Sequence, residues 1–244
     1  MRLIQITDCH LHADPEARSR MGVPFRQLQR VLDRARALRP DLLLVTGDIS
    51  QDETPASYRH AARAFSAMEC PWFWFPGNHD RPQYMNEERE ILDEVDLGDW
   101  RLVMLDSRLS GQAHGEIGKA QLQELALKLE EDERPVLLAL HHPPIELGST
   151  WLDAIGLADR EAFWQTLAAY GQVRAILFGH AHQAYTARHA SAHGDIAIYG
   201  CPATADQFLG GSPTFAIDEA SRPGLRVVDL EEGALSTWVE RVDL

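Results

Sequence analysis

The sequence predicts an α/β fold, and three observations support that prediction. Apolar runs of strand length alternate with stretches of helix length from the N-terminus to about residue 182. Such alternation is typical of βαβ units, whose parallel strands place the loops that follow them at one edge of a sheet. Five of the apolar runs are followed at once by short clusters of Asp, Asn and His. No linker, repeat or low-complexity segment interrupts the chain, so we expect one domain over residues 1–244.

Five strands are predicted, one directly before each polar cluster. Their runs of Leu, Val, Ile, Phe and Trp suit strands that are buried on both faces. They cover residues 3–7, 42–46, 72–75, 136–140 and 175–178. We expect the five strands to be neighbours in one sheet, which would bring their polar clusters into a single pocket.

Helices are expected between these strands. Pro24 begins one whose apolar residues share a face, and Pro40 helps to end it. Thr54 and Pro55 are typical of an N-cap and the first residue of a second helix. Three further helices are expected near residues 81–94, 118–131 and 159–170.

The pattern changes after His182, where short strands follow one another without helices. They are expected near residues 185–189, 196–199, 214–217, 225–230 and 236–242. This run predicts a second, mostly antiparallel sheet stacked on the first.

The polar clusters contain seven side chains that suit transition metals. They are Asp8, His10, Asp48, Asn78, His141, His180 and His182. Seven exceeds the four ligands of a tetrahedral site, whereas two ions that share one carboxylate would use all of them and leave room for a bridging hydroxide. Asp48 is the expected bridge, because it is a carboxylate that sits midway in the set. Imidazole and carboxylate oxygen suit two manganese, iron, zinc or cobalt ions, and such pairs serve displacement at phosphorus.

His79 is expected to face the substrate instead of a metal ion. From beside Asn78, its imidazole could protonate the leaving alkoxide or stabilise the phosphorane, which makes His79 and Asp48 the candidate catalytic residues. Asp80 could orient His79 through the other ring nitrogen, or cap the helix that begins near residue 81, and the sequence leaves both roles open.

Other residues near the ligands are not expected to bind metal. Pro143 and the proline after it hold the backbone extended, so we expect His142 to point away from the ions. Cys9 is expected to be buried and inert. Three aromatic residues in or after the ligand-bearing loops could stack on a base or pack in the core: Trp151, Phe208 and Tyr185.

Composition excludes several classes of function. A net charge of −14 opposes nucleic acid, which needs a basic surface, so the expected partner is a small molecule. No apolar run approaches the roughly 18 residues that span a bilayer, and the N-terminus lacks the features of a secretory signal. Three cysteines suit a reducing compartment, so we expect a cytoplasmic protein. Nothing in the sequence determines the oligomeric state.

The five clusters together resemble a known superfamily, the calcineurin-like metallophosphoesterases. They read Asp8-Cys9-His10, Gly47-Asp48, Gly77-Asn78-His79-Asp80, His141-His142 and Gly179-His180-Ala181-His182. The stretches TGDISQDET, FPGNHD, LHHPP, GHAHQ and FAIDEASRPGLR further resemble the CpdA/Icc branch, the class III cyclic-nucleotide phosphodiesterases of bacteria. Cys9 replaces the Thr or Ser that the family often has, and Pro143 replaces a third His, but neither position is a ligand.

This resemblance implies a four-layer αββα sandwich of two mixed sheets flanked by helices, with a dinuclear metal site at the sheet edge. It implies hydrolysis of 3′,5′-cyclic AMP to 5′-AMP by a metal-bridging hydroxide. The alternatives are another small phosphodiester, such as a 2′,3′-cyclic nucleotide or a glycerophosphodiester, or a non-catalytic nucleotide-binding module.

Overall fold

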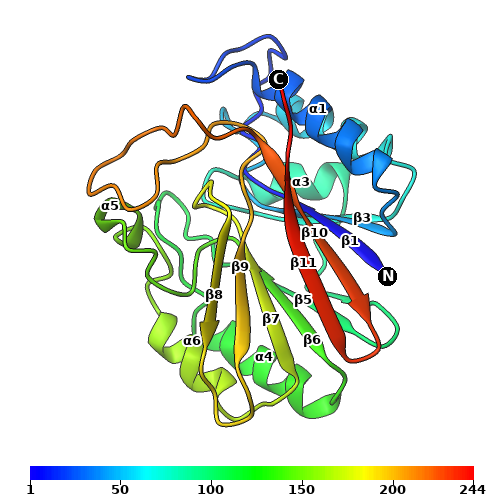
Figure 1. The fold of residues 1–244 in the computed structure, drawn as a ribbon, viewed down its shortest axis with the longest axis vertical. Coiled ribbons are helices and arrows are strands. Elements are labelled where there is room, and N and C mark those ends of the chain that lie inside the picture. The colour runs from blue at the N-terminus through cyan, green and yellow to red at the C-terminus, as the bar shows by residue number, and fades with distance from the viewer.

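Two β-sheets pack face to face between two layers of helices (Figure 1). The structure is a computed structural model that describes all 244 residues. Each sheet contains both parallel and antiparallel neighbours, so the expected α/β sandwich of two mixed sheets is confirmed. None of the helices is both long enough and apolar enough to cross a bilayer.

The first sheet has the strand order β11-β10-β1-β2-β3. Its strands are β1 (Arg2–Ile6), β2 (Leu42–Thr46), β3 (Trp72–Phe75), β10 (Gly224–Glu231) and β11 (Ala234–Arg241). Strands β1 to β3 are parallel, and β10 joins β1 in the antiparallel direction. The helices α1 (Pro24–Ala37), α2 (Pro55–Ser66) and α3 (Pro82–Glu88) pack on the outer face of this sheet.

The second sheet has the order β4-β5-β6-β7-β9-β8. Its strands are β4 (Glu94–Asp96), β5 (Arg101–Leu105), β6 (Val136–Leu140), β7 (Val173–Phe178), β8 (Tyr185–His189) and β9 (Ile196–Gly200). Helices α4 (Lys119–Glu131) and α6 (Arg160–Leu167) cover its outer face, and the short helix α5 (Thr150–Asp153) follows β6.

Side-chain alternation along the strands produces the layers. Leu3 of β1 contacts the core between the two sheets, whereas Ile4 and Ile6 contact the helices. Residues of β6 and β7 divide in the same way between the inner core and the layer of α4 and α6. Strands that are buried on both faces therefore read as continuous apolar runs.

The predicted starts of two helices are confirmed. Pro24 is the first residue of α1, and the backbone turns to a φ of 51° at Arg39, just before Pro40. Thr54 caps α2, because its side-chain oxygen accepts a hydrogen bond from the backbone N–H of Ser57 at 3.4 Å.

The predicted grouping of the strands is wrong in two respects. The five strands before the polar clusters do not share a sheet, since β1, β2 and β3 belong to the first and β6 and β7 to the second. The C-terminal strands do not form a sheet of their own. β8 and β9 extend the second sheet, and β10 and β11 extend the first, where β10 pairs with β1.

Smaller differences concern the bounds of elements. Residues 214–217 form no strand and contribute one isolated bridge between Ile217 and Phe208. The helix expected over residues 81–94 ends at Glu88, because the chain enters β4 at Glu94. Strand β5 is a further buried element that the sequence prediction did not include.

Candidate metal centre

All seven predicted ligands lie in loops at the carboxyl ends of parallel strands. Asp8 and His10 follow β1, Asp48 follows β2, and Asn78 follows β3, all in the first sheet. His141 follows β6, and His180 and His182 follow β7, both in the second sheet. The site therefore lies where the loop-bearing edges of the two sheets meet.

The backbone of these loops is unusual. Five of the predicted ligands have left-handed backbone conformations, with φ of 53° at Asp8, 46° at His10, 51° at Asp48, 62° at His180 and 51° at His182. Non-glycine residues adopt such values rarely and mostly where surrounding structure imposes them, as at functional sites. With these backbone conformations His180 reaches the Oδ1 of Asn78, and His182 reaches the Nε2 of His10.

Three of the side chains, Asp8, His10 and His182, form a first group. The Nε2 atoms of His10 and His182 are 3.1 Å apart, and the Oδ1 of Asp8 lies 3.3 Å from the Nε2 of His182. All three donor atoms lie within 4.8 Å of one another, which is the spacing expected of ligands that share one ion.

A second group consists of Asn78, His141 and His180. The Oδ1 of Asn78 is 3.2 Å from the Nε2 of His141 and 3.0 Å from the Nδ1 of His180. Asp48 lies between the two groups, with its Oδ2 3.4 Å from the Nε2 of His141 and 3.8 Å from the Nε2 of His10. A carboxylate in this position reaches both groups.

The donor chemistry of the cluster fits cations. The Nδ1 of His141 lies 2.8 Å from the carbonyl oxygen of Thr46, and the Nδ1 of His182 lies 2.6 Å from that of Asp206. A carbonyl only accepts, so each ring donates its Nδ1–H there and its Nε2 presents a lone pair. Those lone pairs face the acceptor oxygens of Asp48 and Asp8. Backbone carbonyls orient metal-binding imidazoles in this way in many proteins.

The electrostatics agree with that fit. Burial by itself would lower the pKa of His141, but the carboxylate of Asp48 outweighs burial and raises that pKa to about 9. Burial would also raise the pKa of Asp48, but His141, His10 and His79 outweigh it and hold that pKa well below its usual value. The negative field that favours a protonated ring is the same field that attracts a metal cation.

His79 lies at the half-buried mouth of the cluster. Its ring centroid is 5.2 Å from that of His10, and its backbone N–H donates to the Oδ1 of Asp48 at 2.9 Å. Both roles left open for Asp80 are wrong. The carboxylate of Asp80 makes its hydrogen bonds to groups other than the imidazole of His79, and helix α3 begins after Arg81 without a side-chain cap.

Asp80 instead connects two loops of the site. Its carboxylate accepts hydrogen bonds from the backbone N–H groups of Ile49 and Ser50, both at 3.1 Å, and of Gly77 at 2.9 Å. The hydroxyl of Tyr58 donates to the same carboxylate at 3.1 Å. Asp80 thus ties the loop that carries Asp48 to the loop that carries Asn78.

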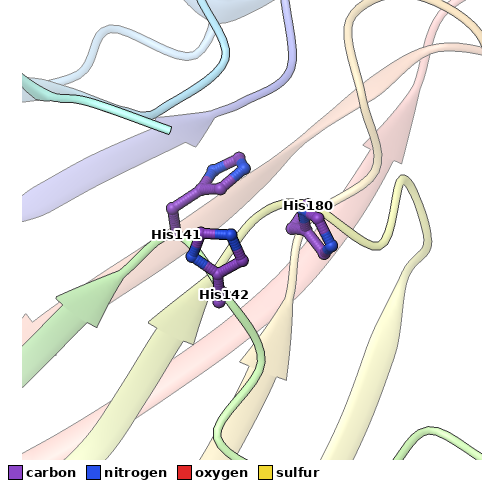
Figure 2. A group of neighbouring side chains, drawn as sticks. All are labelled: His141, His142 and His180. Atoms are coloured by element: carbon purple, nitrogen blue, oxygen red, sulfur yellow. The ribbon is translucent and has the colours of Figure 1, made fainter. Parts of the chain in front are cut away.

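His142 lies nearer to the cluster than the sequence suggested. Figure 2 shows it beside His141 and His180, and its ring centroid is 4.7 Å from that of His180. The expectation that it points away is therefore wrong. Both ring nitrogens have other partners, with Nδ1 2.8 Å from the Oγ of Ser107 and Nε2 3.2 Å from the carbonyl oxygen of Ala113. His142 packs against the second group and is already hydrogen-bonded.

The remaining residues from the sequence analysis occupy different places. Cys9 is fully buried in the core beneath α1 and α2, where burial raises the pKa of its thiol. Phe208 stacks on His182, with ring centroids 3.9 Å apart, and Trp151 packs behind it. Tyr185 contacts Phe178 in the second sheet and lies away from the cavity beside the first group.

Several residues of the site carried no recognised sequence signal. Ser107, which holds His142, follows β5 as the ligands follow their strands, so an apolar run before a polar residue could have indicated it. Tyr58 and Asp206 act through contacts that are distant in sequence. No local pattern identifies such partners.

Comparisons with known proteins agree with this geometry. Residues 1–184 match the calcineurin-like phosphoesterases. The 3′,5′-cyclic adenosine monophosphate phosphodiesterase CpdA of Pseudomonas aeruginosa is 36% identical over 249 residues, covering 99% of this chain and 90% of that protein. CpdA of Escherichia coli K12 is 34% identical with the same coverage. A probable cyclic nucleotide phosphodiesterase of Synechococcus is 37% identical, covering 100% of this chain and 93% of the relative.

Solved structures share the fold at low sequence identity. A dimetal phosphatase from Danio rerio superposes with a TM-score of 0.68 at 14% identity, covering 99% of both chains. The purple acid phosphatase PPD1 of yellow lupin superposes with a TM-score of 0.66 at 14% identity, covering 98% of this chain and 51% of that one. These two likenesses concern the arrangement of the sheets and helices.

Proposed function

The chain belongs to the calcineurin-like phosphoesterases, and from that premise we propose that it hydrolyses 3′,5′-cyclic AMP to 5′-AMP. It is a metal-dependent cyclic-nucleotide phosphodiesterase. Relatives that match nearly the whole chain carry that name. The observation that carries the proposal is the convergence of two ligand groups on one shared carboxylate, Asp48.

The two groups would each hold one ion. Asp8, His10 and His182 would hold the first, with Asp48 shared between the ions. A separate set, Asn78, His141 and His180, would hold the second. Two bound ions supply Lewis acidity that neutralises phosphate charge and lowers the pKa of water. We propose iron or manganese, since imidazole and carboxylate ligands without thiolate suit these metals, with zinc or cobalt as substitutes.

His79 would act on the leaving group. Its imidazole lies at the mouth of the cluster, where the 3′-oxygen of a bound cyclic phosphate would be within reach. The hydrogen bond from its backbone N–H to Asp48 holds this loop at a constant distance from the shared carboxylate. In that position the ring can give a proton to the 3′-oxygen as the P–O bond breaks.

The surroundings of the site favour a small substrate. The net charge of −14 opposes a polyanion along an extended track, whereas one cyclic phosphate meets only the local field of the bound cations. We propose that the protein acts in the cytoplasm, which the three free cysteines support. We also propose that residues 1–244 act as one domain, because the C-terminal strand β10 returns to pair with β1 and β11 pairs with β10.

A panel of substrates tests the proposed function. We expect the manganese- or iron-loaded enzyme to have its highest kcat/KM on 3′,5′-cyclic AMP, with 5′-AMP as product, and a chelator to abolish turnover. The panel includes a 2′,3′-cyclic nucleotide, a glycerophosphodiester and bis(p-nitrophenyl) phosphate. Faster turnover of the 2′,3′-cyclic nucleotide or the glycerophosphodiester would reject the proposed substrate. Absence of any turnover with two metals bound would reject the activity itself.

A further inference from the structure

A cavity of about 410 Å³ opens directly beside the first ligand group. His10 and His182 form part of its wall, so the cavity is continuous with the first ligand group. Its volume lies within the range of about 300–1,000 Å³ that small-molecule sites occupy. The far wall comes from two loops, residues 11–23 after β1 and residues 201–223 between β9 and β10.

One side of the cavity is aromatic. Phe208 stacks on His182 at an interplanar angle of 8°, and Phe215 meets Phe208 edge to face with centroids 5.3 Å apart. Phe215 is 44% exposed, so part of its ring is open to a ligand in the cavity. An exposed phenyl ring beside a site is a surface on which a planar ligand can stack.

Two guanidinium groups reach the same cavity. The guanidinium carbon of Arg20 lies 4.6 Å from the centroid of the Phe215 ring, and Arg18 lines the cavity next to it. Neither side chain forms an ion pair with a carboxylate of this chain, so their N–H donors are free for a ligand. A guanidinium plane over a phenyl ring offers both a stacking face and hydrogen-bond donors at its edge.

The walls of the cavity are held together by Asp206. Its Oδ1 accepts hydrogen bonds from the hydroxyl of Ser19 at 2.6 Å and the backbone N–H of Met21 at 2.9 Å. Its Oδ2 accepts from the backbone N–H of Arg20 at 3.1 Å, and its carbonyl accepts from the Nδ1 of His182. The position of Arg20 is therefore set relative to the first ligand group.

We propose that this cavity holds the base of the nucleotide substrate, stacked on the Arg20–Phe215 pair. The inference rests on the proposed function and specifies which part of the chain selects a nucleotide. A purine offers a flat π-system for the pair and ring nitrogens that accept hydrogen bonds from free guanidinium N–H groups. A smaller cavity of about 220 Å³ beyond Phe208 lacks Phe215 and is lined by Asp218 and Arg241, so it offers no equivalent platform.

Two substrates that differ only in the base test the proposal. Cyclic AMP is compared with the 3′,5′-cyclic phosphate of 1-deoxyribose, which keeps the cyclic diester and lacks the base. We expect Phe215→Ala and Arg20→Ala to lower kcat/KM for cyclic AMP by about tenfold to a hundredfold, chiefly through KM, because stacking on the base is lost. Turnover of the base-free substrate should stay the same.

Leu209→Ala is the matched control. Leu209 is 45% exposed on the same loop as Phe215, and it does not line the cavity. We expect this variant to leave both substrates unaffected. A fall on both substrates in Phe215→Ala would overturn the proposal, and so would a wild-type enzyme that does not distinguish the two.

Binding of adenosine to the metal-loaded protein gives a readout without turnover. We expect saturable binding in equilibrium dialysis to the wild type and to Leu209→Ala, and weak binding to Phe215→Ala. This measurement separates two failures. If cyclic AMP is not hydrolysed but adenosine binds in a Phe215-dependent way, the proposed function fails and the base site stands. If adenosine does not bind, or binds equally to all variants, the base site is rejected.

Discussion

Two carboxylates join pairs of loops in two different regions of the molecule. Asp80 ties the loop after β2 to the loop after β3, within the metal centre. Asp206 ties the loop after β1 to the loop after β9, in the wall of the neighbouring cavity. Each accepts several hydrogen bonds, mostly from backbone N–H groups.

The two regions differ in burial. Asp80 is 2% exposed and its donors are buried with it, whereas Asp206 and its partners are partly in contact with water. Loss of a buried acceptor leaves donors without partners, but water can replace an exposed one. The loops of the metal centre are thus held by buried hydrogen bonds whose loss would cost stability. The loops of the cavity wall are held by exposed hydrogen bonds that water can replace. We infer that substitutions in the first region affect catalysis and folding, and those in the second affect substrate selection.

Asp48→Asn should have the largest effect. An amide in this position removes the charge that both ligand groups share, so we expect lower metal content and a fall in turnover of several orders of magnitude. Metal content is measured by mass spectrometry of the purified protein, with cyclic AMP as substrate. Asp41→Asn, at the opposite end of β2, is the control and should change neither. Two metals per chain and a near-normal rate in Asp48→Asn would remove Asp48 from the centre.

His79→Ala should come next and should separate catalysis from metal binding. We expect both metals to stay bound and kcat on cyclic AMP to fall by about 10²–10⁴-fold, since a general acid is lost. An activated p-nitrophenyl ester, whose leaving group needs little protonation, should be affected less. Asn78→Ala on the same loop should instead weaken metal binding. Loss of the metals from His79→Ala would show that its role is ligation.

Asp80→Ala should reduce folding stability more than any change in the cavity wall. Three buried backbone N–H groups would lose their acceptor, so we expect the free energy of unfolding to fall by about 3–5 kcal/mol. Tyr58→Phe removes one hydrogen bond to the same carboxylate and should cost about 1–2 kcal/mol. Urea denaturation in chelator measures both without the contribution of bound metal. Equal stability of Asp80→Ala and the wild type would show that the buried hydrogen bonds of Asp80 do not stabilise the fold.

Asp206→Ala should have the smallest effect. Because water can reach its donors, we expect a loss of about 1 kcal/mol or less in the free energy of unfolding. The variant should also raise KM for cyclic AMP, because the backbone N–H of Arg20 loses its acceptor. A cost of about 1 kcal/mol in binding free energy corresponds to about a fivefold rise in KM, so we expect a rise of that size or smaller. Metal content should not change. A stability loss as large as that of Asp80→Ala would erase the difference between the two regions.

Much of the site was predictable from local sequence. Each predicted ligand directly follows a buried strand, and the end of a parallel strand places the next residues at the sheet edge whichever sheet it joins. For that reason the ligands converge although the predicted sheet was wrong. The starts of α1 and α2 were likewise predictable, because Pro24 and Thr54 act through their own turn of backbone.

The partners of the ligands were not predictable. His142 was expected to point away because its backbone is extended, but Ser107, 35 residues earlier, sets the direction of the ring. Asp80 was expected to serve its neighbours in sequence, but its carboxylate reaches back 31 residues to the backbone of Ile49. Periodicity records which face of a strand or helix is buried, and contains no information about what covers that face.

The sequence by itself determined the polar residues that follow each buried strand, their order along the chain and the starts of α1 at Pro24 and α2 at Thr54, because these depend on a few neighbouring residues. Only the tertiary structure decided that β10 completes the first sheet, that Asp48 lies between two ligand groups, and that Arg20 meets Phe215 across a cavity. Those arrangements depend on hydrogen bonds and packing between segments far apart in the chain. Their free energy is gained only when both sheets are in place.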